Sequence, residues 1–355
     1  MVKSATLMKP IILLMKKFFQ KYSRFHFASQ SQTIKNYVTI IISIKMKKIS
    51  LFIAVTTALL FASCKNEQNG TTNSNKETVT IIHDLDTVAV PKNPQRIVVL
   101  DYSELEDLDY IGAKVVGIPK SGIPSHLKKY EEDSSIEDLG NVVEINIEKI
   151  NELQPDLIII GGRLRESYPQ LSKIAPTILT EWDSKDHLKA LKKNLDDLGE
   201  IFNKKEELNK AYNEITTKAN RIKAEAEKSD KKALVVMHNK GKMSAYGSGS
   251  RFGLIHDALG VKEAVSNLGV HLHGSSVSNE FVMEKNPDIL FVVDRSDAIG
   301  DKGLNKNDFE NPLIKSTNAY KNGKIVYLNS SIWYLSGGGI TSINMMMDEI
   351  ENAIK

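Results

Sequence analysis

The sequence predicts an α/β protein in which two Rossmann-like lobes are joined by a long rigid helix, with a ligand cleft between the lobes. Three features lead to this fold class. Short apolar strands alternate with helices in two separate stretches of the chain. A segment with helical periodicity lies between these stretches. One helix–loop–strand unit occurs once in each stretch, which indicates two lobes of similar construction.

The first stretch, residues 78–184, is predicted to form the N-terminal α/β lobe. Two β-rich runs joined by a turn open it, and a buried strand is predicted at 96–100, where Arg96 is followed by four apolar residues. A similar run covers 156–160, and helices are expected over 103–111 and 146–152. Continuous apolar strands alternating with helices are typical of a parallel sheet whose faces are both covered.

The segment 185–230 is predicted to be the linking helix. Leu188, Leu191, Leu195 and Leu198 recur at helical spacing with charged residues between them, and no proline interrupts the pattern. One long helix and two abutting helices both fit this periodicity, whose length exceeds that of an ordinary globular helix. In either form the segment predicts a stiff helical spine.

The second stretch, residues 231–355, is predicted to form the C-terminal α/β lobe. Apolar strands are expected at 232–237 and 288–293, and a closing helix at 341–354. The helix and Asn-Pro-Asp loop before the second strand repeat the unit at 146–160. Because ligands of open α/β sheets bind at the carboxyl ends of the strands, two such lobes predict a cleft between them.

The N-terminal part of the chain differs in charge from the rest. Residues 1–63 carry ten Lys and Arg and no Asp or Glu, which leaves 37 basic against 44 acidic residues in the remainder. A split of this size at one end indicates a leader segment and excludes a nucleic-acid-binding surface as the explanation.

Residues 46–63 have the three-part pattern of a lipoprotein signal peptide. A basic start and an apolar run of 13 residues precede small residues and Cys64, the only cysteine. The apolar run is shorter than the ~20 residues that a transmembrane helix needs. We therefore expect lipidation of Cys64, a flexible tether over 64–77, and a membrane-anchored protein outside the cytoplasm, in the periplasm or on the outer face of the cytoplasmic membrane.

Residues 1–45 have no role in this arrangement, and Met46 is expected to be the real start. We therefore predict that residues 1–45 are a non-native upstream extension. The alternative is an additional basic amphipathic helix at a membrane surface.

Three arginines follow predicted strands or loops, where the cleft is expected. Arg163 follows the strand at 156–160, Arg251 follows a Gly/Ser-rich loop, and Arg295 follows the strand at 288–293. A guanidinium stays charged and forms paired hydrogen bonds, so it suits a planar, anionic, oxygen-rich ligand. A surface ion pair is the alternative for each, for example between Arg295 and its neighbour Asp294.

Histidine and tyrosine supply candidate iron ligands. His271 and His273 would share one face of an extended segment, and Tyr334 lies just before three glycines. A phenolate oxygen and an imidazole nitrogen are suitable ligands of Fe(III). Spacing alone does not exclude the alternative, in which the histidines lie in a turn and the tyrosine is a packed aromatic side chain.

The recognised enzyme motifs are not matched in this sequence. The glycine-rich segment 247–253 has one residue too many for a dinucleotide fingerprint and lacks the Lys-Ser/Thr of a P-loop. A metal-dependent hydrolase would have to use His83, His238, His271 and His273, and no H-E-x-x-H motif accompanies them. We therefore predict a protein that is not an enzyme.

Three long stretches carry a resemblance to a known family: GSGSRFGLIHDALG, HGSSVSNEFVMEKNPDILFVVDR and NGKIVYLNSSIWYLSGGG. In this order they resemble the helical-backbone class (class III) of periplasmic binding proteins, in the branch that binds ferric catecholate siderophores such as petrobactin. The resemblance covers about residues 78–355. It implies a substrate-binding lipoprotein that delivers an anionic ferric siderophore to the permease of an ABC importer, without a cofactor and as a monomer.

The resemblance also implies roles for individual residues. Arg163, Arg251 and Arg295 match the ligand-binding arginines of the family. His273 and Tyr334 match the pair that can complete the iron shell when a siderophore offers only four donors.

The family docks on its permease through one acidic residue on each lobe, and Glu144 and Glu280 match those positions. Each is expected at the start of a helix, where a carboxylate is in any case favoured by the helix dipole. Helix capping is therefore the alternative for both.

Other ligands and functions fit parts of the pattern. A cobalamin or haem binding protein would share the fold but would need a wider and more apolar cleft than three arginines indicate. A lipoprotein adhesin would leave the arginines unexplained.

Overall fold

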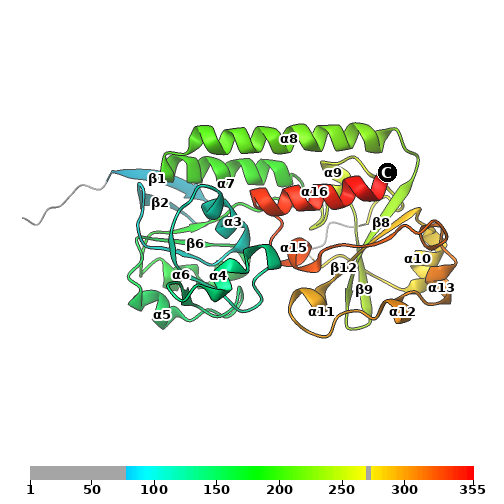
Figure 1. Cartoon of the computed structure of the whole chain (residues 1–355), viewed down its shortest axis with the longest axis horizontal. Coiled ribbons are helices and arrows are strands. Elements are labelled where there is room, and N and C mark those ends of the chain that lie inside the picture. The colour runs from blue at the N-terminus through cyan, green and yellow to red at the C-terminus, as the bar shows by residue number, and fades with distance from the viewer. Residues whose placement is uncertain (1–76, 269–272) are drawn as a thin grey trace, which may run out of the picture. The chain divides into compact units, whose positions relative to one another are not determined.

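The computed structural model of the protein describes residues 77–268 and 273–355 (Figure 1). The predicted upstream extension, the signal peptide, Cys64 and His271 lie outside these residues, as does the tether before residue 77. Within the two described ranges, no helix is both long and apolar enough to cross a bilayer.

The first sheet is parallel throughout and has the strand order β5-β4-β3-β6-β7. Its strands β3 and β6 are buried along their whole length, which explains their uninterrupted apolar sequences. An antiparallel hairpin of β1 and β2 precedes it. The elements of this lobe are β1 (Thr78–His83), β2 (Asp86–Pro91), β3 (Ile97–Val99), α3 (Tyr102–Tyr110), β4 (Val115–Ile118), η1 (Ser125–Leu127), α4 (Lys129–Glu132), β5 (Glu137–Asp138), α5 (Ile147–Glu152), β6 (Leu157–Ile160), η2 (Gly162–Ser167), α6 (Tyr168–Leu171) and β7 (Thr177–Leu179).

The second sheet has the order β11-β9-β8-β12-β13 and is mixed. Its strands β8, β12 and β13 are parallel, whereas β9 runs antiparallel to both β8 and β11. The sequence did not indicate β9, a short strand with polar residues at its first and third positions. The elements are β8 (Lys232–Asn239), β9 (Lys242–Tyr246), α9 (Leu254–Asp257), β10 (Lys262–Glu263), β11 (Ser275–Val277), α10 (Asn279–Lys285), β12 (Ile289–Asp294), α11 (Arg295–Ala298), α12 (Lys306–Phe309), α13 (Pro312–Lys315), α14 (Asn318–Lys321), β13 (Ile325–Tyr327), α15 (Ser330–Leu335) and α16 (Ile340–Ile354).

The spine consists of two helices, α7 (His187–Phe202) and α8 (Lys205–Glu227), which is one of the two arrangements that the sequence left open. Asn203 ends α7 in the left-handed conformation with φ 56°, a role to which asparagine is suited. The two helices then pack against each other, and α8, at ~1.5 Å per residue about 34 Å long, also packs against α16 (Figure 1). The linking segment is therefore a helical hairpin.

The repeated helix–loop–strand unit is present in both lobes, as α5 with β6 and as α10 with β12. In each, the residue two positions before the aspartate has a positive φ, 45° at Gln154 and 43° at Asn286. The aspartate carboxylate then accepts a backbone N–H at the start of a neighbouring strand, from Arg96 directly before β3 in one lobe and from Lys232 of β8 in the other. The two α/β lobes joined by a helical spine confirm the predicted fold class.

Candidate functional site

Three arginines from different elements converge on Tyr334 of α15. Arg163, in η2, donates from Nη2 to the Tyr334 carbonyl oxygen at 2.5 Å, and Arg251 donates to the same oxygen at 2.6 Å. Arg295, the first residue of α11, donates from Nε to the Tyr334 phenol oxygen at 2.8 Å. We call these four residues the arginine–tyrosine site. Because Arg163 comes from the first lobe and the others from the second, the site lies between the lobes.

The guanidinium groups also lie over the Tyr334 ring. The distances from the guanidinium carbon to the ring centroid are 4.4 Å for Arg251, 5.5 Å for Arg295 and 5.7 Å for Arg163. Contacts of this kind are favourable because the ring face carries partial negative charge. The three guanidinium groups thus all contact the same aromatic side chain.

No ion pair with an acidic side chain balances the positive charge of this site within the part of the chain that the structure describes. Within the described residues, none of the three arginines makes an ion pair. Asp294, the alternative partner of Arg295, instead caps α11 by accepting the Ser296 N–H at 3.1 Å. Burial, and then the charge of Arg163, lower the pKa of Arg251 to about 10. A group of cations that repel one another and make no ion pair among the described residues favours an anionic ligand.

A half-buried carboxylate lies close to Arg163. Asp101 caps α3 by accepting the Ser103 N–H at 2.9 Å, and burial raises its pKa while the charge of Arg163 opposes that rise. The Asp101 carboxylate lies close to the backbone of residue 161, which must be glycine because a Cβ at that position would lie 2.1 Å from the Asp101 Oδ2. Since Asp101 already serves the α3 N-terminus, its charge only partly offsets that of Arg163.

Trp182 is a further residue of the site that the sequence did not indicate. It lies between β7 and α7 and is 47% exposed, which is unusual for so large an apolar side chain. Its ring contacts that of His187 edge-on, with centroids 5.2 Å apart, and His187 Nε2 lies 3.2 Å from the Arg251 carbonyl oxygen. It also lies beside Gly338, where an added Cβ would be 3.9 Å from the Trp182 ring. An exposed aromatic ring next to the segment that follows Tyr334 is suited to a flat aromatic ligand.

His273 is exposed, and no hydrogen bond or ring contact joins it to the described residues of the arginine–tyrosine site. Its neighbour Gly274 lies against Tyr246, whose ring a Cβ on Gly274 would approach to 2.8 Å. Tyr246 in turn packs edge-on against Phe252, the residue after Arg251, at 4.7 Å. His273 therefore lies on a segment that passes close to the site.

The two glutamates predicted to dock on a permease are both exposed. Glu144 precedes α5 by three residues, and Asn146 caps that helix by accepting the Lys149 N–H, so Glu144 has no capping role. Glu280 lies in the first turn of α10, where hydrogen bonds with Ser278 and its own backbone lower its pKa. Helix capping therefore explains the position of Glu280 but not that of Glu144.

The histidines considered for a hydrolase belong to different lobes. His83 lies 3.3 Å from the Thr177 carbonyl oxygen in the first lobe, and His238 lies on β8 of the second lobe, 3.7 Å from Asp294. Across the described ranges, no group of three or more His, Cys, Asp or Glu side chains is placed to hold a metal ion.

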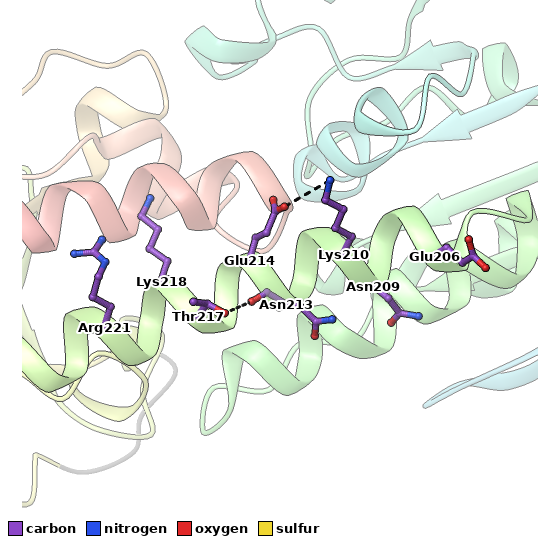
Figure 2. A pocket seen from close by; sticks show the side chains of 8 residues that line it. All are labelled: Glu206, Asn209, Lys210, Asn213, Glu214, Thr217, Lys218 and Arg221. Carbon is purple, nitrogen blue, oxygen red and sulfur yellow. Dashed lines mark hydrogen bonds and ion pairs between the residues drawn. The ribbon is translucent and has the colours of Figure 1, made fainter.

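A shallow hollow along α8 is a second candidate for a site (Figure 2). Two of its cations already have partners on α16, because Lys218 pairs with Asp348 at 2.7 Å and Arg221 binds both carboxylate oxygens of Glu351 at 2.7 Å. These contacts hold α8 against α16. The hollow is therefore part of the polar face of the spine. The lining residues are Glu206, Asn209, Lys210, Asn213, Glu214, Thr217, Lys218 and Arg221.

Comparison with known proteins places the chain among binding proteins for iron chelates. It is 42% identical to the petrobactin-binding protein YclQ of Bacillus subtilis over 317 residues, which is 87% of this chain and 100% of YclQ. It is 37% identical to the ferric-anguibactin-binding protein FatB of Vibrio anguillarum over 277 residues, which is 77% of this chain and 86% of FatB.

Solved structures agree with the sequence comparison. The crystal structure of YclQ superposes with a TM-score of 0.77 over 79% of this chain and 99% of YclQ, at 42% identity. The periplasmic catecholate-siderophore binding protein VctP of Vibrio cholerae gives a TM-score of 0.74 over 78% of this chain and 100% of VctP, at 32% identity. The sequence pattern of the periplasmic binding protein family matches residues 97–332, so the chain belongs to that family.

Proposed function

We propose that the protein binds a ferric catecholate siderophore at the arginine–tyrosine site and delivers it to the permease of an ABC importer. The observation that carries this proposal is the convergence of Arg163, Arg251 and Arg295 on Tyr334 without an acidic partner among the described residues. The family is one of binding proteins, which confirms the prediction that the chain is not an enzyme. The ligand needs no separate cofactor.

The charge of the ligand matches that of the site. Three catecholate groups around Fe(III) leave three negative charges, which three guanidiniums neutralise with directed hydrogen bonds to the oxygens. In this structure, two guanidiniums donate to a neutral carbonyl, the Tyr334 oxygen. Exchanging that neutral acceptor for an anionic oxygen strengthens each hydrogen bond.

Tyr334 and His273 are proposed to complete the iron shell of a siderophore that offers only four donors. Arg295 fixes the position of the Tyr334 phenol oxygen, and a hard, anionic phenolate suits Fe(III). His273 lies on the segment beside Tyr246, next to the arginine–tyrosine site. For a siderophore with six donors, both residues line the ligand without touching iron.

Delivery is proposed to depend on the membrane anchor and on the two exposed glutamates. Relatives are named ABC transporter substrate-binding or siderophore-binding lipoproteins, which supports an extracytoplasmic location. Lipidation of Cys64 would keep a monomeric binding protein beside its permease. Glu144 and Glu280 would each contact one half of that permease, and siderophore uptake by cells carrying Glu144→Gln and Glu280→Gln tests this.

The ligand class is tested by titrating the purified protein with ferric catecholates, ferric hydroxamates, haem and cobalamin. Trp182 is the exposed reporter of binding, whereas Trp333 is 3% exposed and donates to Glu349 at 2.6 Å. We expect fluorescence quenching at submicromolar concentrations of ferric catecholates and much weaker responses to the other ligands. Tighter binding of haem, cobalamin or a hydroxamate would overturn the proposal.

A further inference from the structure

The N-terminus of α16 is capped by side chains from the other lobe. An α-helix leaves its first backbone N–H groups without partners inside the helix, and the residue before α16, Gly339, has no side chain to accept them. Residues of α3 accept these N–H groups instead. The bonds are Gly338 N to Ser103 Oγ at 3.1 Å, Ile340 N to Asp107 Oδ1 at 2.7 Å and Ser342 N to Glu106 Oε2 at 2.7 Å.

These three residues, Ser103, Glu106 and Asp107, form what we call the α3 clamp. Glu106 and Asp107 are 2% and 0% exposed, so their hydrogen bonds to α16 are shielded from water and are correspondingly strong. The second oxygen of Glu106 lies 2.7 Å from His126 Nε2, which fixes that carboxylate from the side of its own lobe. The clamp is thus a preformed acceptor surface for the helix end.

The contact between α3 and the start of α16 depends on glycine. A Cβ on Gly339 would lie 2.5 Å from the Ser103 carbonyl oxygen and 2.6 Å from the Glu106 Oε2. Gly337 has φ 96°, a conformation that other residues rarely adopt. Gly338 and Gly339 therefore allow close approach to the other lobe, and Gly337 allows the turn before α16.

The clamped segment begins only four residues after Tyr334. Since α15 ends at Leu335, the clamp at 338–342 limits where the Tyr334 carbonyl and ring can lie. Arg163, which donates to that carbonyl, belongs to the same lobe as α3, and Asp101 at the start of α3 lies beside it. Helix α3 therefore contacts both sides of the Arg163–Tyr334 hydrogen bond: its N-cap residue lies beside Arg163, and its side chains hold the segment that follows Tyr334.

We infer that Ser103, Glu106 and Asp107 are positioning residues for the ligand, because they hold the start of α16 and thereby fix where the Tyr334 phenol oxygen lies beside the three arginines. A site held in this way before binding loses less conformational freedom when the ligand arrives. This inference rests on the proposed function.

The test compares two substitutions of Asp107 in the full chain. Asp107→Ala removes the acceptor of the Ile340 N–H, whereas Asp107→Asn keeps one. We expect Asp107→Ala to weaken binding of a ferric catecholate by about tenfold and Asp107→Asn by less than about threefold. Ser103→Ala, which removes a half-buried hydroxyl, is the variant to use if Asp107→Ala does not fold, and its expected loss is smaller.

Leu108→Ala is the matched control, because Leu108 is a fully buried neighbour whose apolar side chain accepts no hydrogen bond from the α16 backbone. It should lower the melting temperature about as much as Asp107→Ala and leave the affinity unchanged. Equal affinities for Asp107→Ala and Leu108→Ala would overturn the inference.

A second readout needs no ligand, so it separates failure of the clamp from failure of the proposed function. In a Trp333→Phe background, Trp182 beside Gly338 is the single tryptophan. Its emission maximum should shift by several nanometres in Asp107→Ala and not in Leu108→Ala. Unchanged emission would count against the clamp, and this holds even if no ferric catecholate binds to the wild-type protein.

Discussion

Replacing Arg251 with glutamine is expected to weaken binding of a ferric catecholate by roughly 30- to 3000-fold. Removing one partner of a buried, hydrogen-bonded charge pair costs about 2–5 kcal/mol, and each 1.4 kcal/mol is a factor of about ten in affinity. Arg251 should show the largest effect of the three arginines, because burial already lowers its pKa to about 10 and its charge gains most from an anionic ligand. Isothermal titration calorimetry measures the change.

Arg165→Gln is the matched control for that experiment. Arg165 lies in η2 with Arg163, but it is exposed and pairs with Asp84 at 3.1 Å, away from Tyr334. Its substitution should leave the affinity unchanged. An Arg251→Gln protein that binds as tightly as Arg165→Gln would show that the arginine–tyrosine site does not hold the ligand.

Replacing Glu104 with glutamine is expected to stabilise the protein at neutral and alkaline pH. Burial, and then the nearby carboxyl of Asp107, raise the pKa of Glu104 well above its ordinary value of 4.5. The protonated form is therefore favoured in the fold, and its contribution to stability is complete below pH 4.5 and is lost as the pH rises towards the raised pKa. A glutamine side chain has nearly the same shape as that of glutamate but cannot ionise, so the loss of stability with rising pH is avoided.

We expect Glu104→Gln to raise the free energy of unfolding by about 1–3 kcal/mol at pH 8, with a difference that shrinks towards pH 4.5. Urea denaturation at several pH values measures this. Some pH dependence should remain, because burial also raises the pKa of Asp107. The exposed Glu166→Gln variant is the control, and an equal gain in that variant would contradict the assignment to burial.

The fold was predictable where a local pattern decides the structure. Uninterrupted apolar runs identified β3, β6, β8 and β12 because strands buried on both faces have no polar side to display. The repeated unit was visible because the same turn chemistry precedes β6 and β12.

The fold was not predictable where tertiary contacts decide it. β9 has a polar first half and becomes a strand because β8 and β11 pair with it on either side. The break in the spine falls at Asn203 and Lys204 without a glycine or proline, so the periodicity continues through it.

The candidate site shows the same division. The arginines were found because each follows a strand or a glycine-rich loop, and strand ends face a ligand in α/β folds. Trp182 and the α3 clamp were missed because their roles depend on residues far away in the chain, such as Gly338, which bonds to Ser103. The only local signal was the acidic run in α3 that directly follows a buried strand.

The central claim is tested most directly by locating iron in crystals of the protein with a ferric catecholate that offers four donors. Anomalous scattering at the iron edge gives the position of the metal. We expect an iron peak at the arginine–tyrosine site, with catecholate oxygens on Arg163, Arg251 and Arg295 and the Tyr334 phenol oxygen within bonding distance of iron. An iron peak away from Tyr334 and the three guanidiniums, for example along α8, would contradict it.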